Sequence, residues 1–126
     1  MPVESTSDQG QNLTKHVVKG PVSEEEMYSA LEDFYGNEPT LYLLWDMSQA
    51  DLEHVTPDIL KKFIKRAVEL GKSRQKARTA VIAPNDLQYG LGRMSEAFFL
   101  LESAPFNFKA FRSRQDALTW LMEGEE

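Results

Sequence analysis

The sequence has 126 residues, of which 41% are apolar and 10% aromatic, so it can build one domain with its own core. It contains no cysteine, which excludes disulfide bonds and thiolate chemistry and fits a reducing, cytoplasmic location. Its apolar runs are too short to span a bilayer, and its polar start is not that of a secretory signal. We expect a flexible tail over residues 1–11 and a single domain over residues 12–124.

The first elements are a strand and a helix. Residues 13–18 (LTKHVV) include three β-branched residues and predict a strand. Ser23 and Glu26 then stand at capping-box spacing, which predicts that a helix begins there. Gly36 is a good end for this helix, because glycine accepts the left-handed cap.

The second strand and helix follow from residue 40. Residues 40–47 are nearly all apolar, as expected for a strand buried on both faces of a sheet. A polar loop over residues 48–55 leads to Thr56 as N-cap and Pro57 at the first helical position. Gly71 is expected to end this helix.

Two more strands and helices complete the chain. Residues 78–83 and 106–111 predict strands, and Asn85 or Asp86 is expected to cap the long helix between them. The spacing of apolar residues predicts the buried stripe of that helix as Leu87, Leu91, Met94, Phe98 and Leu101. The order β-α-β-α-β-α-β-α indicates an α/β fold with a mostly parallel central sheet of four to five strands and helices packed on it.

Known catalytic and cofactor motifs are absent from the sequence. No glycine-rich dinucleotide or phosphate loop follows a strand, and no GxSxG elbow is present. Gly90 and Gly92 lie inside a predicted helix, where close packing of the helix on the sheet explains them best. We therefore predict no enzyme activity, no cofactor and no metal.

An acidic loop follows the second strand. It carries Asp46, Asp51, Glu53 and His54, whose spacing matches no zinc or calcium loop. We predict that Asp46 accepts hydrogen bonds from backbone amides of the loop. A solvated acidic loop is the favoured interpretation of these four residues, and a partner or ligand surface is the alternative. Tyr89 and Arg93, one helical turn apart, are assigned to the same surface.

A basic segment stands out from the net charge of −6. Between residues 61 and 78 only Glu69 is acidic. A solvated helix face explains the segment, but a basic edge could also bind an anionic ligand, a lipid headgroup or nucleic-acid phosphate. The residues of this basic edge are Lys61, Lys62, Lys65, Arg66, Lys72, Arg74, Lys76 and Arg78.

The segment LYLLWDMSQADLEHVTPDILKKF resembles the STAS family, which includes the anti-sigma-factor antagonists. The resemblance covers roughly residues 13–122 and extends to AVIAPNDLQYGLGRMSEAF and FKAFRSRQDALTWL, which are similar to a branch of uncharacterised bacterial STAS-like proteins. In the family an apolar strand ends in an Asp-Leu-Ser-like turn, matched here by residues 46–48, and a phosphorylatable Ser or Thr opens the next helix. The resemblance thus marks Ser48 and Thr56 as phosphoacceptor candidates.

This sequence departs from the family at the phosphorylation signature. His54-Val55-Thr56-Pro57 stands where antagonists carry Asp-Ser-Ser/Thr-Gly, and the N-cap role already accounts for Thr56. The resemblance therefore implies a non-enzymatic protein-interaction module more than a phosphorylation switch. Its expected partner is another protein or a second copy, for which Tyr42, Trp45 and Trp120 are candidate contacts. Binding of an anionic ligand or a lipid surface by the basic edge remains the alternative.

Overall fold

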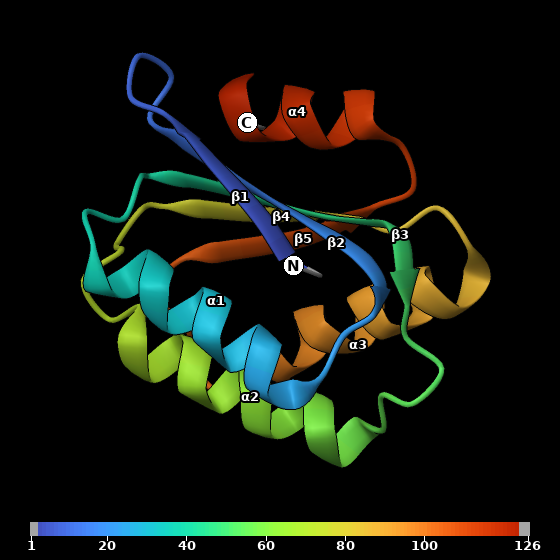
Figure 1. Cartoon of the computed structure of the whole chain (residues 1–126). Helices are drawn as coiled ribbons and strands as arrows, with labels where there is room; N and C mark the ends of the chain where they lie inside the picture. The colour runs from blue at the N-terminus through green and yellow to red at the C-terminus, as the bar shows by residue number, and fades with distance from the viewer. Residues whose placement is uncertain (1–2, 124–126) are drawn as a thin grey trace.

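The computed structural model describes residues 3–123. It contains five strands and four helices, alternating after the first two strands (Figure 1). The elements are β1 Val3–Asp8, β2 Leu13–Pro21, α1 Glu24–Gly36, β3 Tyr42–Asp51, α2 Pro57–Leu70, β4 Arg78–Ile82, α3 Asp86–Leu101, β5 Asn107–Phe111 and α4 Arg114–Glu123.

The strands form one sheet in the order β1-β2-β3-β4-β5. Strands β2 to β5 run parallel, and β1 pairs antiparallel with β2. Helices α1, α2 and α3 lie on one face of the sheet and α4 on the other (Figure 1). Alternate residues of the central strands therefore enter two cores: Leu43 and Trp45 face α1–α3, whereas Leu44 faces α4. The predicted α/β fold with a mostly parallel sheet is confirmed.

The helix starts follow the predicted caps. The Ser23 and Glu26 side chains form a reciprocal capping box at α1. Thr56 Oγ1 accepts a hydrogen bond from the Ile59 amide at 3.2 Å, with Pro57 at the first position of α2. Local side-chain chemistry thus fixes where these helices begin.

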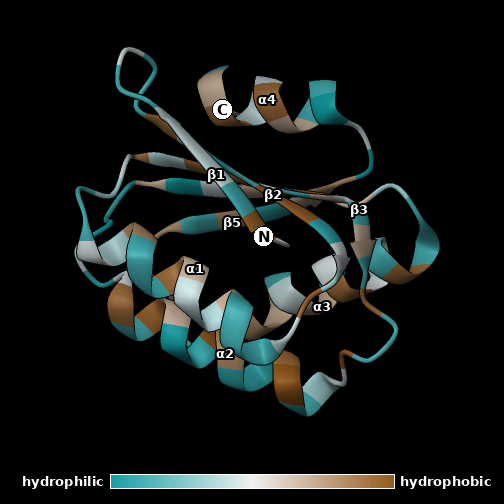
Figure 2. Cartoon of the chain, viewed as in Figure 1, coloured by the Kyte–Doolittle hydropathy of each residue, from teal (hydrophilic) through white to brown (hydrophobic). Residues whose placement is uncertain are grey.

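The expected tail over residues 1–11 is wrong for residues 3–8. These residues form β1, whose register runs from Val3 opposite Val18 to Asp8 opposite Leu13. All of β1 after Val3 is exposed, and Figure 2 shows it mostly in the white and teal of intermediate and hydrophilic residues. A solvated edge strand needs backbone partners but no apolar face, so its composition resembles that of a tail.

The expected loop over residues 48–55 is wrong for its first part. Strand β3 continues to Asp51, because β2 extends to Pro21 and pairs with residues 49–51 beyond a register shift at Val17–Lys19. The Gln88 side-chain amide also donates hydrogen bonds to the Met47 and Ala50 carbonyl oxygens at 2.7 and 3.1 Å. Backbone and side-chain partners together hold this polar segment extended.

The predicted stripe of α3 is wrong by one position. The buried residues are Gln88, Gly92, Ser95 and Phe99, whereas Leu87 and Leu101 are exposed. A Cβ atom at Gly92 would stand 2.8 Å from the Ala110 Cβ, so the missing side chain lets α3 approach the sheet on this face. Close approach of the backbone, rather than the largest apolar side chains, decides how α3 packs.

Candidate functional site

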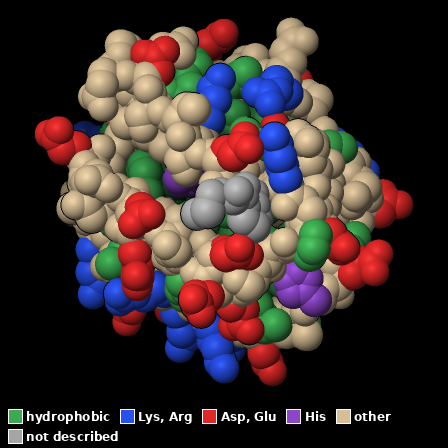
Figure 3. Space-filling model, viewed as in Figure 1, with side chains coloured by type: hydrophobic (Ala, Val, Ile, Leu, Met, Phe, Trp, Pro, Cys, Tyr) green, Lys and Arg blue, Asp and Glu red, His purple; other side chains and the backbone are tan. Residues whose placement is uncertain are grey.

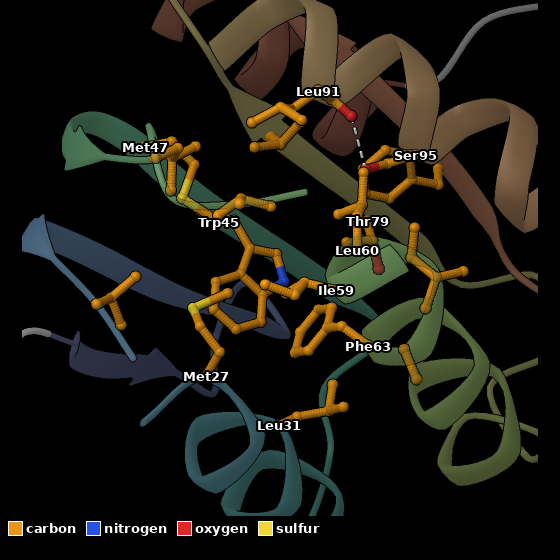
Figure 4. A pocket seen from close by; sticks show the side chains of 18 of the residues that line it. Met27, Leu31, Trp45, Met47, Ile59, Leu60, Phe63, Thr79, Leu91 and Ser95 are labelled. Atoms are coloured by element: carbon orange, nitrogen blue, oxygen red, sulfur yellow. Dashed lines mark hydrogen bonds between the residues drawn. The ribbon is translucent and has the colours of Figure 1, made fainter. Parts of the chain in front are cut away.

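A cavity lies between the sheet and helices α1, α2 and α3. It has a volume of about 120 Å³ and apolar walls from the three helices and from β3, β4 and β5 (Figure 4). Helix α1 packs against α2, and α2 packs against α3. The central wall residues include Met27, Leu31, Trp45, Phe63, Leu91 and Phe99.

The cavity has an open end and an inner end. At the open end the lining residues are partly exposed and come from the first turns of the helices, such as Met27 and Leu60. At the inner end they are buried, such as Ile64 and Phe106. On α1 the lining extends from Glu24 to Tyr35, so the cavity runs about 16 Å along the helix axis.

Trp45 occupies the middle of the cavity wall. Its indole lies between Met27 and Ile59 in Figure 4, and its ring meets that of Phe63 edge-on at 6.2 Å. It is 5% exposed, so it cannot serve as the surface aromatic expected for a dimer. Its position instead makes it a reporter of anything that enters the cavity.

Few polar groups reach the cavity. The Ser95 hydroxyl donates a hydrogen bond to the Leu91 carbonyl oxygen at 2.8 Å, and the Gln88 side-chain amide donates one to the Met47 carbonyl oxygen of β3. At the inner end the lining residues Tyr35 and Thr79 carry hydroxyls that accept hydrogen bonds from Arg74 Nη1 at 3.2 and 2.9 Å. The site is therefore apolar along its length with one polar end.

Asp46 lies at the other face of the sheet, against α4. It is 5% exposed, and its Oδ1 accepts hydrogen bonds from the Ser48 amide and hydroxyl at 3.0 and 2.6 Å. The predicted bonding of local backbone by Asp46 is thus observed. Its Oδ2 pairs with Arg114 Nη2 at 2.6 Å, a partner 68 residues away that local sequence could not indicate. The arrangement ties α4 to the sheet.

The other acidic-loop residues do not converge with Asp46. Asp51 Oδ1 accepts a hydrogen bond from the Glu53 amide, and His54 Nε2 donates one to the Val22 carbonyl oxygen at 2.7 Å. Among the described residues, no group of three or more His, Asp or Glu side chains is placed to hold a metal ion. Thr56 is exposed as well as capping α2, and whether it or Ser48 is phosphorylated stays a prediction.

Tyr89 and Arg93 lie together on the exposed side of α3. Arg93 Nη1 donates to the Tyr89 hydroxyl at 3.4 Å, and the Arg112 guanidinium stacks 4.4 Å over the Tyr89 ring. This cluster joins α3 to the segment after β5. It lies outside the cavity wall formed by Gln88, Leu91 and Ser95, so its role as a partner surface stays a prediction.

The basic edge is only partly formed. Figure 3 shows Lys and Arg side chains along the lower edge of this view, where α2 lies in Figure 1. Arg66 pairs with Glu32 and Glu69. Arg74 is buried, and Arg78 donates to the Leu121 carbonyl oxygen of α4. The predicted continuous edge is thus wrong at Arg74, whose guanidinium is buried with backbone acceptors, whereas Arg78 is partly exposed. The exposed members are Lys61, Lys62, Lys65, Lys72 and Lys76.

One nucleophile–base contact went unnoticed in the sequence. Ser5 Oγ and His16 Nδ1 lie 2.6 Å apart across β1 and β2. Burial lowers the pKa of His16 from 6.5 to about 4, and its Nε2 has no hydrogen-bond partner. An imidazole with that pKa and no orienting group is a weak general base at neutral pH.

Comparison with known proteins supports the fold. A solved structure from Shewanella loihica PV-4, described as an uncharacterised protein of the DUF3478 family with a SpoIIAA-like fold, is 25% identical. The similarity covers 94% of this chain and 91% of that chain, with a TM-score of 0.57. No family model matches the chain, and no curated protein does. The chain therefore has a SpoIIAA-like, STAS-like fold, as the sequence resemblance implied. Within residues 3–123, no helix is both long and apolar enough to cross a lipid bilayer.

Proposed function

We propose that this protein is a non-enzymatic binding module that holds an apolar small molecule between α1, α2, α3 and the sheet. The cavity carries the proposal: it is about 120 Å³, open at one end and walled almost entirely by apolar side chains. Ligand sites are typically concave and mostly apolar, with a few placed polar groups. An engineered apolar cavity of about 150 Å³ is large enough for benzene, so this volume admits a ligand of similar width.

The fold suggests a regulatory role for this binding site. STAS-like domains such as the anti-sigma-factor antagonists act by contacting other proteins, and the first turns of α1 and α2 form the open end of the cavity. A ligand that occupies the cavity would contact both helices. We propose that occupancy sets the spacing of these helices and thereby the surface that a partner meets.

Trp45 fluorescence tests the binding site directly. The chain has two tryptophans, so Trp120→Phe leaves Trp45 as the only indole reporter. Titration with hexanol is expected to change Trp45 emission and to saturate at one site. Leu60→Glu, which places a charge in the apolar entrance, is expected to abolish the change, whereas Ala97→Glu on the exposed side of α3 is not. A flat titration in the parent protein would contradict the proposed site.

We propose a homodimer contact as a second function of the same module. Leu100 and Leu101 are 81% and 76% exposed at the end of α3, and Leu87 is 45% exposed at its start. Exposed apolar side chains of this size on one helix are typical of protein contacts. Sedimentation equilibrium is expected to show a dimer that Leu100→Glu with Leu101→Glu disrupts. A monomer at all concentrations would contradict this proposal.

A further inference from the structure

Arg74 is a buried cation without a carboxylate partner. Its residue is 5% exposed, and none of the ion pairs among residues 3–123 includes it. The guanidinium donates to the Leu41 and Arg78 carbonyl oxygens at 3.0 and 3.3 Å and stacks 5.2 Å from the Phe34 ring centre. All its partners are neutral, and its Nε has none.

A buried charge held only by neutral groups is unusual. Removing a guanidinium from water is costly unless an opposite charge accompanies it. The negative end of α2, which closes just before Arg74, offsets part of this cost. The remainder leaves an uncompensated positive potential beside the inner end of the cavity, where Arg74 also stacks against Phe106, a lining residue.

Two hydroxyls connect this charge to the cavity. Tyr35 and Thr79 both line the inner end, and the hydroxyl of each accepts a hydrogen bond from Arg74 Nη1. A hydroxyl that accepts one hydrogen bond still has its own proton to donate. Burial raises the pKa of Tyr35, against the opposing influence of Arg74, so its hydroxyl keeps that proton at neutral pH. Neither hydroxyl proton has a hydrogen-bond acceptor among residues 3–123. Tyr35 and Thr79 therefore supply two hydrogen-bond donors, both polarised by Arg74, at the inner end of the cavity.

We propose that the cavity binds a carboxylic acid with an unbranched apolar body, whose carboxylate accepts hydrogen bonds from Tyr35 and Thr79 in the field of Arg74. This inference rests on the proposed apolar-ligand function and names its ligand class. A carboxylate fits better than a phosphate, because it brings one charge to one guanidinium, whereas a phosphate monoester carries about −1.5 to −2. The apolar body would then lie along Trp45 and Phe63 toward the open end.

Calorimetric titration of the parent protein with hexanoate, hexanol and hexylammonium tests this assignment. We expect hexanoate to bind at least about tenfold more tightly than hexanol, since a hydrogen bond to a charged group is worth about that factor or more. Hexylammonium is expected to bind most weakly. Tyr35→Phe and Thr79→Val, which keep Arg74 and the side-chain volume, should each reduce the preference for hexanoate by about tenfold.

Tyr28→Phe is the matched control. Tyr28 also lines the cavity, but it lies two turns closer to the start of α1 than Tyr35, so its loss should leave the preference unchanged. Equal binding of hexanoate and hexanol, or an undiminished preference in both hydroxyl variants, would overturn the carboxylate assignment and leave the apolar site standing. Binding of none of the three probes would overturn the proposed function itself.

Discussion

His16 makes the stability of this protein depend on pH in a calculable way. The residue is 2% exposed on β2, with its ring centre 4.4 Å from that of Trp45 and 6.0 Å from that of Phe34. Burial in these apolar surroundings lowers the pKa of His16 from 6.5 to about 4. The folded protein therefore holds this imidazole neutral over a range in which the unfolded chain protonates it.

The sign and size of the effect follow from this difference in pKa. The folded state binds the proton more weakly than the unfolded state, so the stabilisation is complete above the unfolded pKa of 6.5. It is lost as the pH falls from 6.5 toward 4. Between pH 7 and pH 5 the loss attributable to His16 is about 2 kcal/mol, and it levels off at about 3 kcal/mol below the folded pKa.

Urea unfolding at the two pH values measures this loss. Carboxylates also titrate in this range, so the test compares the parent protein with His16→Phe, which replaces the imidazole by another ring. The free energy of unfolding of His16→Phe should change by about 2 kcal/mol less between pH 7 and pH 5. His54→Gln, which alters the other histidine of the chain, should retain the parent dependence. Equal pH dependence in the parent and His16→Phe would refute the reasoning.

Two further predictions concern helix geometry. Gly92→Ala should lower the free energy of unfolding by about 1–2 kcal/mol, because the new Cβ meets that of Ala110 at 2.8 Å. Gly90→Ala, where a Cβ would meet nothing within 4 Å, should raise the free energy of unfolding by about 1 kcal/mol. Thermal unfolding of the two variants shows whether packing against the sheet or helix propensity decides the effect at each glycine. Thr56→Ala should cost about 1 kcal/mol by removing the cap on the Ile59 amide, whereas Thr56→Ser should cost almost nothing, as urea titration can show.

The parts of the fold that were predictable are those governed by neighbouring residues. The caps at Ser23 and Thr56 satisfy amides three positions away, so short sequence patterns are sufficient to place the starts of α1 and α2. The apolar run of β3 likewise records burial on both faces. Strand β1 escaped prediction because its partner, β2, supplies backbone hydrogen bonds that leave no trace in side-chain composition.

The candidate site was less predictable, because distant segments build it. Arg74 lies among polar residues in a short loop and looks like a surface residue, yet Tyr35, Leu41 and Thr79 surround its guanidinium after folding. The cavity itself lies where α1, α2 and α3 meet the sheet, so residues far apart in the sequence form its wall. Neither apolar periodicity nor capping records the distance between a helix and a sheet.

Strand β1 has a consequence for how this protein behaves at high concentration. An unpaired strand edge is a template on which other chains can assemble, and β2 would present such an edge with Val17 and Val18 on it. β1 covers that edge and turns outward a row of exposed residues that includes Glu4 and Asp8. A chain shortened by its first eight residues would therefore expose the unpaired edge of β2 in place of the charged strand β1. Such a chain is expected to form fibrils at high concentration.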